Sequence, residues 1–372
     1  MGIPKNLLEN FFKLGFLALV VSNIPDVYDS YVNQVKHGTL NIIKIVRIIL
    51  LFALQITLIF QVVIDWKKRN ANPGMSILIS RLLLLMLPLF VLLLPNFYFF
   101  TRQYVGLTLL MISGSLNLRF SSYNFFRRLF FMHLSLQIIQ LLFLNNHQGL
   151  LFGMLNLRNT GIFLMPSTSA IFTILMLLLF DSIGSLKFSS WILMILSVAL
   201  SASGLGVVLL LVYIMWKLRF DKVVFSILIV GTFPLVYYLL PIVLSRPTLY
   251  ISIIDRFENW SDKISVLGLF PSFSSGMYTN AYATLAKNKG DMIWRNFIVD
   301  GDLISIFLNL GLILGLLFYS RIIYKSFLKE KGIIYFIFFL ASLTVSILEM
   351  LWVPLILILI ISETNERKMA YR

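Results

Sequence analysis

Long apolar stretches, separated by short polar breaks, run through most of this chain. A run of about 20 apolar residues forms a helix that crosses about 30 Å of hydrocarbon. Short alternating segments, the pattern of membrane barrels, do not occur. The pattern therefore predicts an all-α polytopic membrane protein of about 12 transmembrane helices. The expected spans cover residues 8–22, 42–64, 77–95, 104–118, 129–144, 169–184, 189–201, 204–217, 223–244, 302–320, 333–347 and 349–362.

Basic residues show which polar breaks face the cytoplasm, because cytoplasmic segments of membrane proteins collect lysine and arginine. If the amino terminus is inside, the short outer segments hold only Lys36, Arg102 and Arg158. Both ends of the chain are then expected in the cytoplasm. The inner segments hold Lys5, Lys67, Lys68, Arg69, Arg119, Arg127, Arg128, Lys187, Lys217, Arg219, Lys222, Arg321, Lys325, Lys329, Lys331, Arg367, Lys368 and Arg372.

Composition excludes several classes of protein. Hydrophobic residues make up 59% of the chain and the mean hydropathy is +0.90, which rules out a soluble fold. The net charge of +15 follows the predicted topology, so a nucleic-acid partner is not expected. The chain has no cysteine and three histidines, and we expect neither a metal nor another cofactor.

One segment breaks the regular spacing of spans. Residues 245–301 form a large extracytoplasmic loop without a spanning stretch, and function is expected there. Within the loop, residues 252–267 have the pattern of an amphipathic helix lying on the outer membrane surface. Its apolar face is formed by Ile253, Phe257, Trp260, Ile264 and Leu267, and its polar face by Arg256, Asn259 and Lys263. No internal repeat is visible, so residues 1–372 are expected to form a single integral membrane domain.

Two arginines of this loop are candidates for binding a diphosphate. Glycosyl transfer from a lipid diphosphate needs cations that hold the diphosphate and stabilise it as it leaves. The arginine side chain is permanently charged and binds phosphate oxygens in a bidentate manner. Arg246 and Arg256 lie near the expected bilayer surface, where such a headgroup would be. The alternative is that they are snorkelling or solvated arginines.

Three acidic residues are candidate catalytic groups. Asp300 and Asp302 form a D-x-D pair at the end of the loop. One of them is a candidate general base for an acceptor hydroxyl. Alternatively, the pair binds a metal-nucleotide sugar, or opens a helix at its positive end. Glu258 is a third candidate, unless it makes a salt bridge with a nearby cation.

Charged residues within spans are costly and need a partner or a function. Lys44 and Arg47 lie one turn apart in the outer part of the second expected span. They are candidates for lining a cavity that leads to the diphosphate. Snorkelling, or an ion pair between helices, is the alternative.

Four short elements, taken in order, resemble the Wzy-type polysaccharide polymerases and O-antigen ligases. Asp255-Arg-Phe-Glu-Asn-Trp260 is similar to the R-x-E-x-W element that begins the large outer loop of that family. Ser201-Ala-Ser-Gly-Leu-Gly206 resembles its S-x-S-R-T-G element, with Gly204 at the arginine position. The remaining two are the stretch from Asp300 to Gly311, and Glu349 followed by Pro354.

The resemblance implies a glycosyltransferase of the bacterial cytoplasmic membrane. Such an enzyme joins undecaprenyl-diphosphate-linked oligosaccharides, one as donor and one as acceptor, into O-antigen, capsule or exopolysaccharide at the outer face. A chain-length regulator protein is an implied partner. Ligases of this group commonly carry His-Asn where Asp300-Gly-Asp302 stands, which favours a polymerase. A polysaccharide-lipid flippase and an O-antigen ligase remain the alternatives.

Overall fold

A computed structural model describes most of the expected spans. The described residues are 5–32, 42–68, 86–87, 89–112, 123–144, 159–163, 165–184, 186–218, 258–272, 274–288, 299, 301–327 and 332–370. Arg246, Arg256 and Asp300 lie outside these residues, as does the expected span at 223–244.

Throughout the described ranges the chain is helical, without strands. The helices are α1 (Lys5–Val32), α2 (Ile42–Lys68), α4 (Phe97–Ile112), α5 (Tyr123–Ile139), the π-helix η2 (Gln140–Leu144), α7 (Pro166–Ile183), α8 (Phe188–Ser201), α9 (Gly204–Lys217), α12 (Asn280–Asn288), α13 (Asp302–Ser326), α14 (Gly332–Thr344) and α15 (Trp352–Ala370). The all-α prediction is confirmed for this part of the chain.

Within the described residues, four helices contain a stretch long and apolar enough to cross a membrane: Leu7–Ile24, Ile42–Gln61, Pro166–Ile183 and Asp302–Ser326. Shorter apolar helices include Phe188–Ser201, Gly204–Lys217, Gly332–Thr344 and Trp352–Ser362. These findings support a membrane protein. The number of about twelve spans and the position of the 245–301 loop stay predictions.

The chain divides into two compact units, each built from separate stretches of sequence. Unit 1 comprises Met1–Leu92, Thr101–Leu210 and Leu348–Arg372, and unit 2 comprises Leu93–Phe100 and Leu211–Ile347. The division falls inside α4 and inside α9, so no linker in the sequence marks it. Two compact units can belong to one membrane domain, so the single integral membrane domain stays a prediction.

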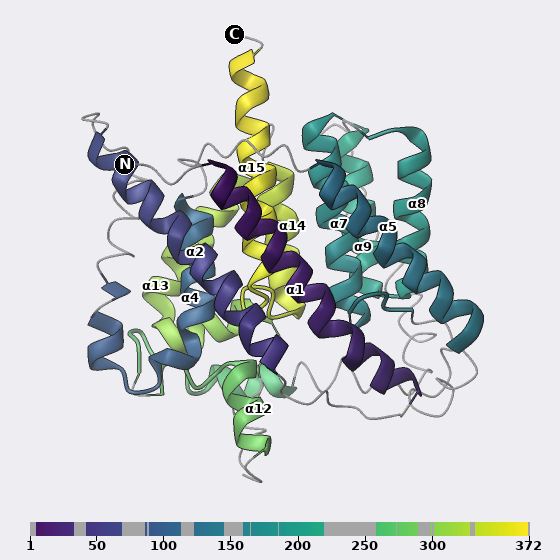
Figure 1. Ribbon diagram of the computed structural model, residues 1–372. Helices are drawn as coiled ribbons and strands as arrows, with labels where there is room; N and C mark the ends of the chain where they lie inside the picture. Colours follow the sequence, from purple (N-terminus) through teal and green to yellow (C-terminus); the bar gives the residue numbers. More distant parts are fainter. Residues whose placement is uncertain are drawn as a thin grey trace. The chain divides into compact units, whose positions relative to one another are not determined.

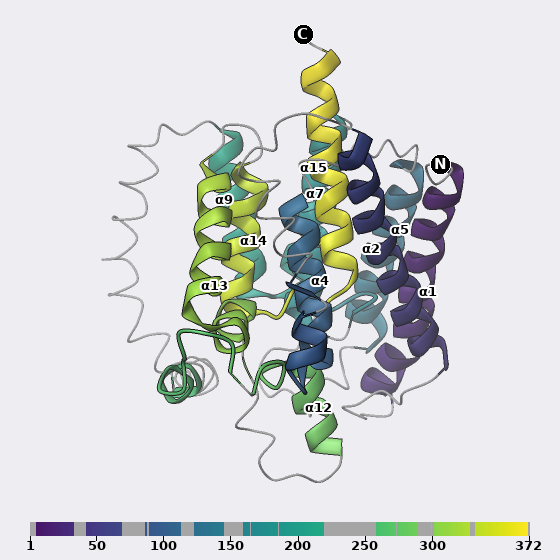
Figure 2. The same cartoon turned by 90° about the vertical axis from the view of Figure 1, so that its left-hand side faces the viewer.

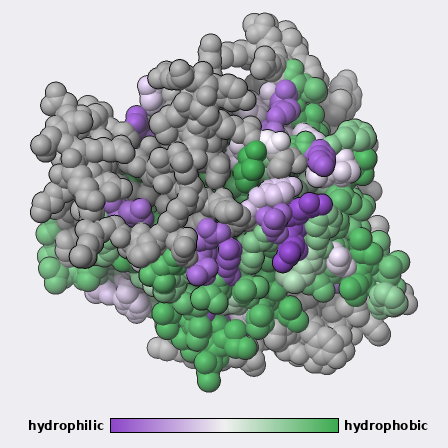
Figure 3. Space-filling model, turned by 45° about the horizontal axis from the view of Figure 1, so that its top comes forward, coloured by the Kyte–Doolittle hydropathy of each residue, from purple (hydrophilic) through white to green (hydrophobic). Residues whose placement is uncertain are grey.

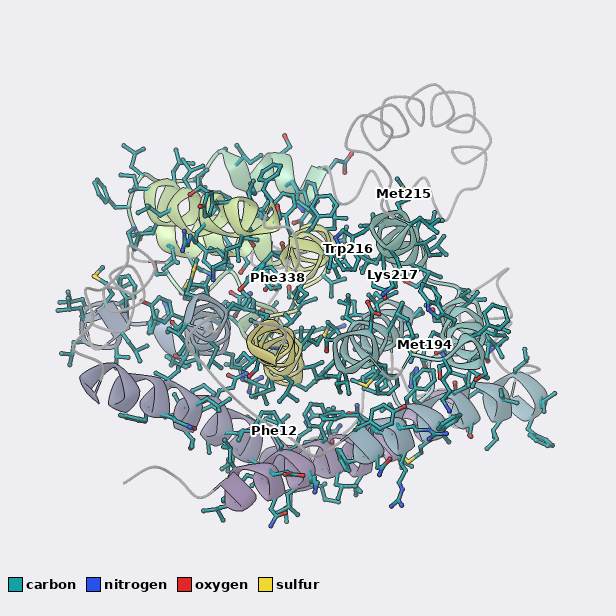
Figure 4. All side chains as sticks on the ribbon, turned by 90° about the horizontal axis from the view of Figure 1, so that it is seen from above. Phe12, Met194, Met215, Trp216, Lys217 and Phe338 are labelled. Atoms are coloured by element: carbon teal, nitrogen blue, oxygen red, sulfur yellow. The ribbon has the colours of Figure 1, made fainter. Side chains whose placement is uncertain are left out.

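The core of unit 1 is built around α7 and α15. Every residue of α7 from Thr168 to Phe180 is buried, and α15 is buried from Trp352 to Ser362. Helices α5, α8 and α15 pack against α7 (Figure 1). In the view from above, Phe12 of α1 and Met194 of α8 point into this unit (Figure 4). A helix that is apolar on all sides belongs at such a central position.

Helices α1 and α2 run side by side and present an apolar outer face (Figures 1 and 2). On α1, Phe12 and Phe16 are buried, whereas Leu14, Leu17 and Val21 are exposed. Hydrophobic side chains likewise cover much of the visible surface of the described helices in Figure 3. Water-soluble proteins avoid apolar surfaces of this extent, but such surfaces suit contact with lipid tails.

The last two helices differ in detail from the expected spans at 333–347 and 349–362. Helix α14 ends at Thr344 and α15 begins only at Trp352. The seven residues between them are not helical, although Ile347, Leu348 and Leu351 are buried. Because these residues are as apolar as the helices, composition alone does not reveal the interruption.

Candidate functional site

The site that stands out in unit 2 is a break in helix α13. The sequence predicts a continuous helix from residue 302 to residue 320. The structure shows Gly311 with φ 77° and ψ 169°, so two helical segments meet at this residue. A Cβ atom at Gly311 would lie 2.7 Å from the carbonyl oxygen of Leu269 and 2.5 Å from the carbonyl carbon of Phe270. Glycine is needed here for its positive φ and for this close approach.

The two segments of α13 fold back towards each other. The rings of Phe307 and Tyr319 stack with their centroids 5.7 Å apart. In an unbroken helix, twelve residues would separate these positions by about 18 Å. The Phe307 ring lies over Gly315, where a Cβ atom would come within 2.4 Å of it. Gly315 thus serves close packing, as its spacing from Gly311 predicts.

The loop residues 268–270 and 275–278 fill the break and satisfy the backbone groups that the break exposes. Leu312 N–H donates to the carbonyl of Gly268 (2.9 Å), and Ile313 N–H donates to the carbonyl of Leu269 (3.2 Å). The carbonyl of Asn309 accepts a hydrogen bond from Ser275 Oγ (2.6 Å). Irregular backbone inside an apolar helix is tolerated only when it is satisfied in this way.

Asn309 is the residue that holds the loop in place. Its Oδ1 accepts hydrogen bonds from the backbone N–H groups of Gly276 (2.8 Å) and Tyr278 (3.3 Å). Its Nδ2 donates to the carbonyl of Tyr278 (3.1 Å) and to Ser305 Oγ (3.3 Å). Ser305 Oγ also donates to the carbonyl of Tyr278. Sequence reasoning placed Asn309 inside a span without a role. The available signal in the sequence was the amide side chain of Asn309, which lies two residues before Gly311 in an otherwise apolar helix.

The other side of the same loop packs on the start of α4. Gly276 has φ 86°, and a Cβ atom there would lie 1.9 Å from the carbonyl oxygen of Asn96. The ring of Tyr282, on α12, meets Phe99 edge-on with centroids 4.9 Å apart. The loop residues 274–282 are therefore held on two sides, by α13 and by the start of α4.

Asp302 is the first residue of α13, at the end of its first segment that is remote from the break, and it is fully buried. The preceding Gly301 has φ 111°, and a Cβ atom there would lie 2.6 Å from the carbonyl oxygen of Leu343. This close approach brings the start of α13 against α14. Asp302 interacts electrostatically with Tyr319 of the second segment. The sequence placed Asp302 at the end of the loop, and the structure shows that it is buried there.

Glu258 has a different environment. It is exposed on the short helix formed by residues 258–264. Of the two candidate acids that are described, Glu258 is therefore a surface carboxylate, whereas Asp302 is buried. Asp300, Arg246 and Arg256 lie outside the described residues.

Lys44 and Arg47 belong to unit 1. Arg47 Nη1 donates to Ser22 Oγ (3.0 Å) and to Asn23 Oδ1 (2.7 Å), both on α1. Lys44 is buried on the same helix. The guanidinium of Arg47 thus links α2 to α1, which favours an interhelical contact over a role in binding diphosphate.

Unit 1 contains a second polar cluster, which the sequence did not indicate. Gln137 Nε2 donates to Asn159 O, Ser169 Oγ and Ser197 O, and Gln137 Oε1 accepts from Ser197 Oγ (2.7 Å). Gln140 exchanges two hydrogen bonds with the backbone of Gly161. These contacts hold the non-helical residues 159–163 against α5, α7 and α8. The available signal in the sequence was the pair Gln137 and Gln140, which lie about one turn apart in an apolar stretch.

Metal binding gains no support from the described residues. They contain no group of three histidine, aspartate or glutamate side chains that could hold an ion. Asp300 lies outside them, so the metal-binding alternative for the D-x-D pair is not tested.

Within the described residues, the regular elements are all helices, some of membrane-spanning length, and the loop residues 268–270 and 275–278 pack at a break in helix α13. Neither a family model, nor a curated protein, nor a solved structure matches the chain. The resemblance to polysaccharide polymerases therefore rests on the four short elements of the sequence.

Asn309→Leu is expected to lower the stability of the loop residues 275–278, which Asn309 holds at the break. The variant keeps the volume of the side chain but leaves Gly276 N–H and Tyr278 N–H without an acceptor. Each buried unpaired group costs about 1–3 kcal/mol. Thermal unfolding and limited proteolysis of purified protein would measure the loss. Ser320→Ala, at an exposed position of α13, is the matched control. Equal stability of the two variants would contradict the role given to Asn309.

Proposed function

We propose that this protein is a polymerase that joins undecaprenyl-diphosphate-linked oligosaccharide repeats at the outer face of the bacterial cytoplasmic membrane. The observation that carries the proposal is the broken helix α13, with the buried carboxylate of Asp302 and the inserted outer loop. Ionisable residues and irregular backbone within apolar helices mark functional sites in membrane proteins. The family resemblance covers the same stretch, from Asp300 to Gly311.

In the proposed reaction, a sugar hydroxyl of the acceptor attacks the anomeric carbon of the donor. The bond between that carbon and the diphosphate oxygen breaks, and undecaprenyl diphosphate leaves. Arg256 and Arg246 stabilise the negative charge of the leaving group. A carboxylate, Asp302 or Asp300, accepts the proton of the attacking hydroxyl. Holding both lipid-linked substrates at one site makes the reaction effectively intramolecular.

The mechanism uses donor and acceptor lipids and requires no nucleotide sugar, metal or other cofactor. A chain-length regulator is a proposed protein partner. The membrane lipid surrounds the apolar outer faces of helices such as α1 and α2, where Leu14, Leu17 and Ile49 are exposed. Glu258 is the weaker catalytic candidate, because it is exposed on a short surface helix and not enclosed in a site that shields a substrate from water.

The proposed topology has about twelve spans, both termini inside and the 245–301 loop outside. Figure 1 supports part of it: within unit 1, α1 begins and α15 ends at the same end. Alkaline phosphatase fused after Lys287 is expected to be active, and a fluorescent protein fused after Arg372 is expected to fluoresce. The reason is the excess of basic residues in the inner segments. If one reporter is active at both positions, the topology is wrong and the mechanism with it.

A flippase is the second candidate function, because the broken helix supports it as well. Transporters also bind their substrates at interrupted helices inside the membrane. A strain that lacks the protein distinguishes the two. A polymerase defect is expected to leave single-repeat glycans on the cell surface, because export still works. Lipid-linked repeats trapped inside the cell would instead support the flippase and reject the polymerase.

A further inference from the structure

The second segment of helix α13 carries an arginine that the proposed reaction does not use. Arg321 follows the expected span at 302–320, at the end that the predicted topology places at the inner membrane surface. Its side chain is half-buried, and its Nε is buried without a hydrogen-bond partner in the part of the chain that the structure describes. No described carboxylate forms an ion pair with it. An unpaired donor of a permanent charge is costly to bury, so an anion is expected at this guanidinium.

The next basic residue of the same helix shows the contrast. Lys325 is buried, its Nζ donates to the hydroxyl of Tyr335 (3.3 Å), and it lies 4.8 Å from the centre of the same ring. Arg321 has an aromatic contact as well, because its guanidinium carbon lies 5.3 Å from the centre of the Tyr324 ring. A contact with the face of a ring does not use the N–H groups in the plane of a guanidinium. These donors can therefore still bind an anion.

The surface beside Arg321 is apolar and follows one face of the helix. Leu316, Leu317 and Tyr324 are 53%, 48% and 59% exposed. Their spacing of three to four residues, counted through Arg321, places them along the same side of α13. Ser320, which is also exposed, donates its hydroxyl to the carbonyl of Leu317. Such a face suits acyl chains, and Arg321 lies where the headgroup of the same lipid would be.

We propose that the surface formed by Leu316, Leu317, Arg321 and Tyr324 binds an anionic phospholipid of the inner leaflet. The guanidinium binds the phosphate of the headgroup through two N–H groups, and the acyl chains lie along the leucines. An exposed ring changes rotamer within nanoseconds, so Tyr324 can turn aside and admit the phosphate to Nε. The unpaired cation selects a headgroup of net negative charge over a zwitterionic one. The bound lipid anchors the segment of α13 that follows the break at Gly311.

Native mass spectrometry of the full-length protein, with phosphatidylglycerol added to the detergent, tests this assignment. Arg321→Met keeps the apolar length of the side chain and removes the charge. It is expected to weaken the tightest binding of phosphatidylglycerol about tenfold or more, since charge-assisted hydrogen bonds are lost. Arg321→Lys keeps the charge without the bidentate fork, and an intermediate affinity is expected. Unchanged affinity of the Arg321→Met protein would overturn the proposal.

Arg127→Met is the matched control. Arg127 is an exposed arginine near the start of α5, in a segment that is also predicted to be inside. Its guanidinium carbon lies 5.6 Å from the centre of the Phe131 ring, so it has the same charge and the same kind of ring contact as Arg321. Its replacement is expected to leave the tightest binding unchanged. An equal loss in both variants would show a general attraction between basic residues and anionic lipid, and would reject a site at Arg321.

A second measurement on the wild-type protein covers the case in which Arg321→Met fails to insert. A phosphatidylglycerol with a diazirine in its acyl chain is photocrosslinked in phosphatidylcholine nanodiscs, and the labelled peptides are identified by mass spectrometry. Labelling of residues 316–327 that unlabelled phosphatidylglycerol removes supports the proposal. Absence of labelling there, or equal competition by additional phosphatidylcholine, rejects it.

Soluble glycerol phosphate distinguishes a lipid site from a site for free phosphate. It carries the charged group without acyl chains, so it is expected not to compete with the labelled lipid. Competition by glycerol phosphate at the concentration at which phosphatidylglycerol competes would assign Arg321 to a free phosphate and reject the lipid. The proposed enzymatic reaction is not needed for either result, so the lipid site and the polymerase activity are tested separately.

Discussion

Replacing Arg256 by alanine is expected to abolish polymer while single-repeat glycan still reaches the cell surface. In the proposed mechanism, the guanidinium of Arg256 stabilises the leaving diphosphate, so its loss is expected to stop glycosyl transfer. Export of the repeat unit is a separate process and continues. Electrophoresis of surface glycans from cells with equal amounts of inserted protein measures the effect. Lys287→Ala, at an exposed lysine of α12 within the loop, is expected to leave polymer unchanged.

The Arg256→Lys variant distinguishes two roles for Arg256: a ligand of the diphosphate and a membrane anchor. Lysine keeps the positive charge but cannot bind two phosphate oxygens with a planar fork, so polymer is expected to fall substantially. A snorkelling arginine, in contrast, would be replaced by lysine without loss. Polymer of near-normal length in the Arg256→Lys cells would reject Arg256 as a diphosphate ligand. Arg246 would then become the principal candidate.

The second large effect is expected from Asp302→Asn. The amide has nearly the same size and still suits the start of a helix, so the protein should insert and fold. It cannot accept the proton of the acceptor hydroxyl. A general base contributes about 10²–10⁴-fold to a reaction rate, and polymer formation by purified protein is expected to fall within that range.

Asp262→Asn is the matched control for this variant, because Asp262 is an exposed acid in the same unit. If Asp302 serves only to stabilise the start of α13, asparagine should replace it with little loss of activity. Normal turnover of Asp302→Asn would therefore exclude Asp302 as the base and leave Asp300 as the remaining candidate of the pair.

The break in α13 explains the position of Asp302. Gly311 allows α13 to fold back, so the start of the helix, with Asp302, comes near Tyr319 in its second segment. Asn309 holds the loop residues 275–278 at the break. In the proposed enzyme, this arrangement keeps a buried carboxylate in the interior, close to the loop, without exposing unpaired backbone to lipid.

The sequence by itself determined that this protein is helical and suited to a membrane. That result follows from long apolar runs, because backbone groups in hydrocarbon must be satisfied within the segment that carries them. Helices α2 and α7 begin and end close to their predicted limits for this reason. The polar residues Arg256, Asn259 and Lys263 were likewise assigned to one helix face from spacing alone.

Only the tertiary structure decided which residues of the helix 258–264 are buried and where a helix breaks. Periodicity shows that two faces of a helix differ, but it does not show which residues are covered: Lys263 is buried, whereas Glu258 and Asp262 of the same helix are exposed. Gly311 is compatible with close packing or with a break, and the choice depends on Leu269 and Phe270, about forty residues away in the sequence. The partners of Arg47 and Asn309 are also distant in the sequence, and hydrogen bonds between distant residues leave no local pattern.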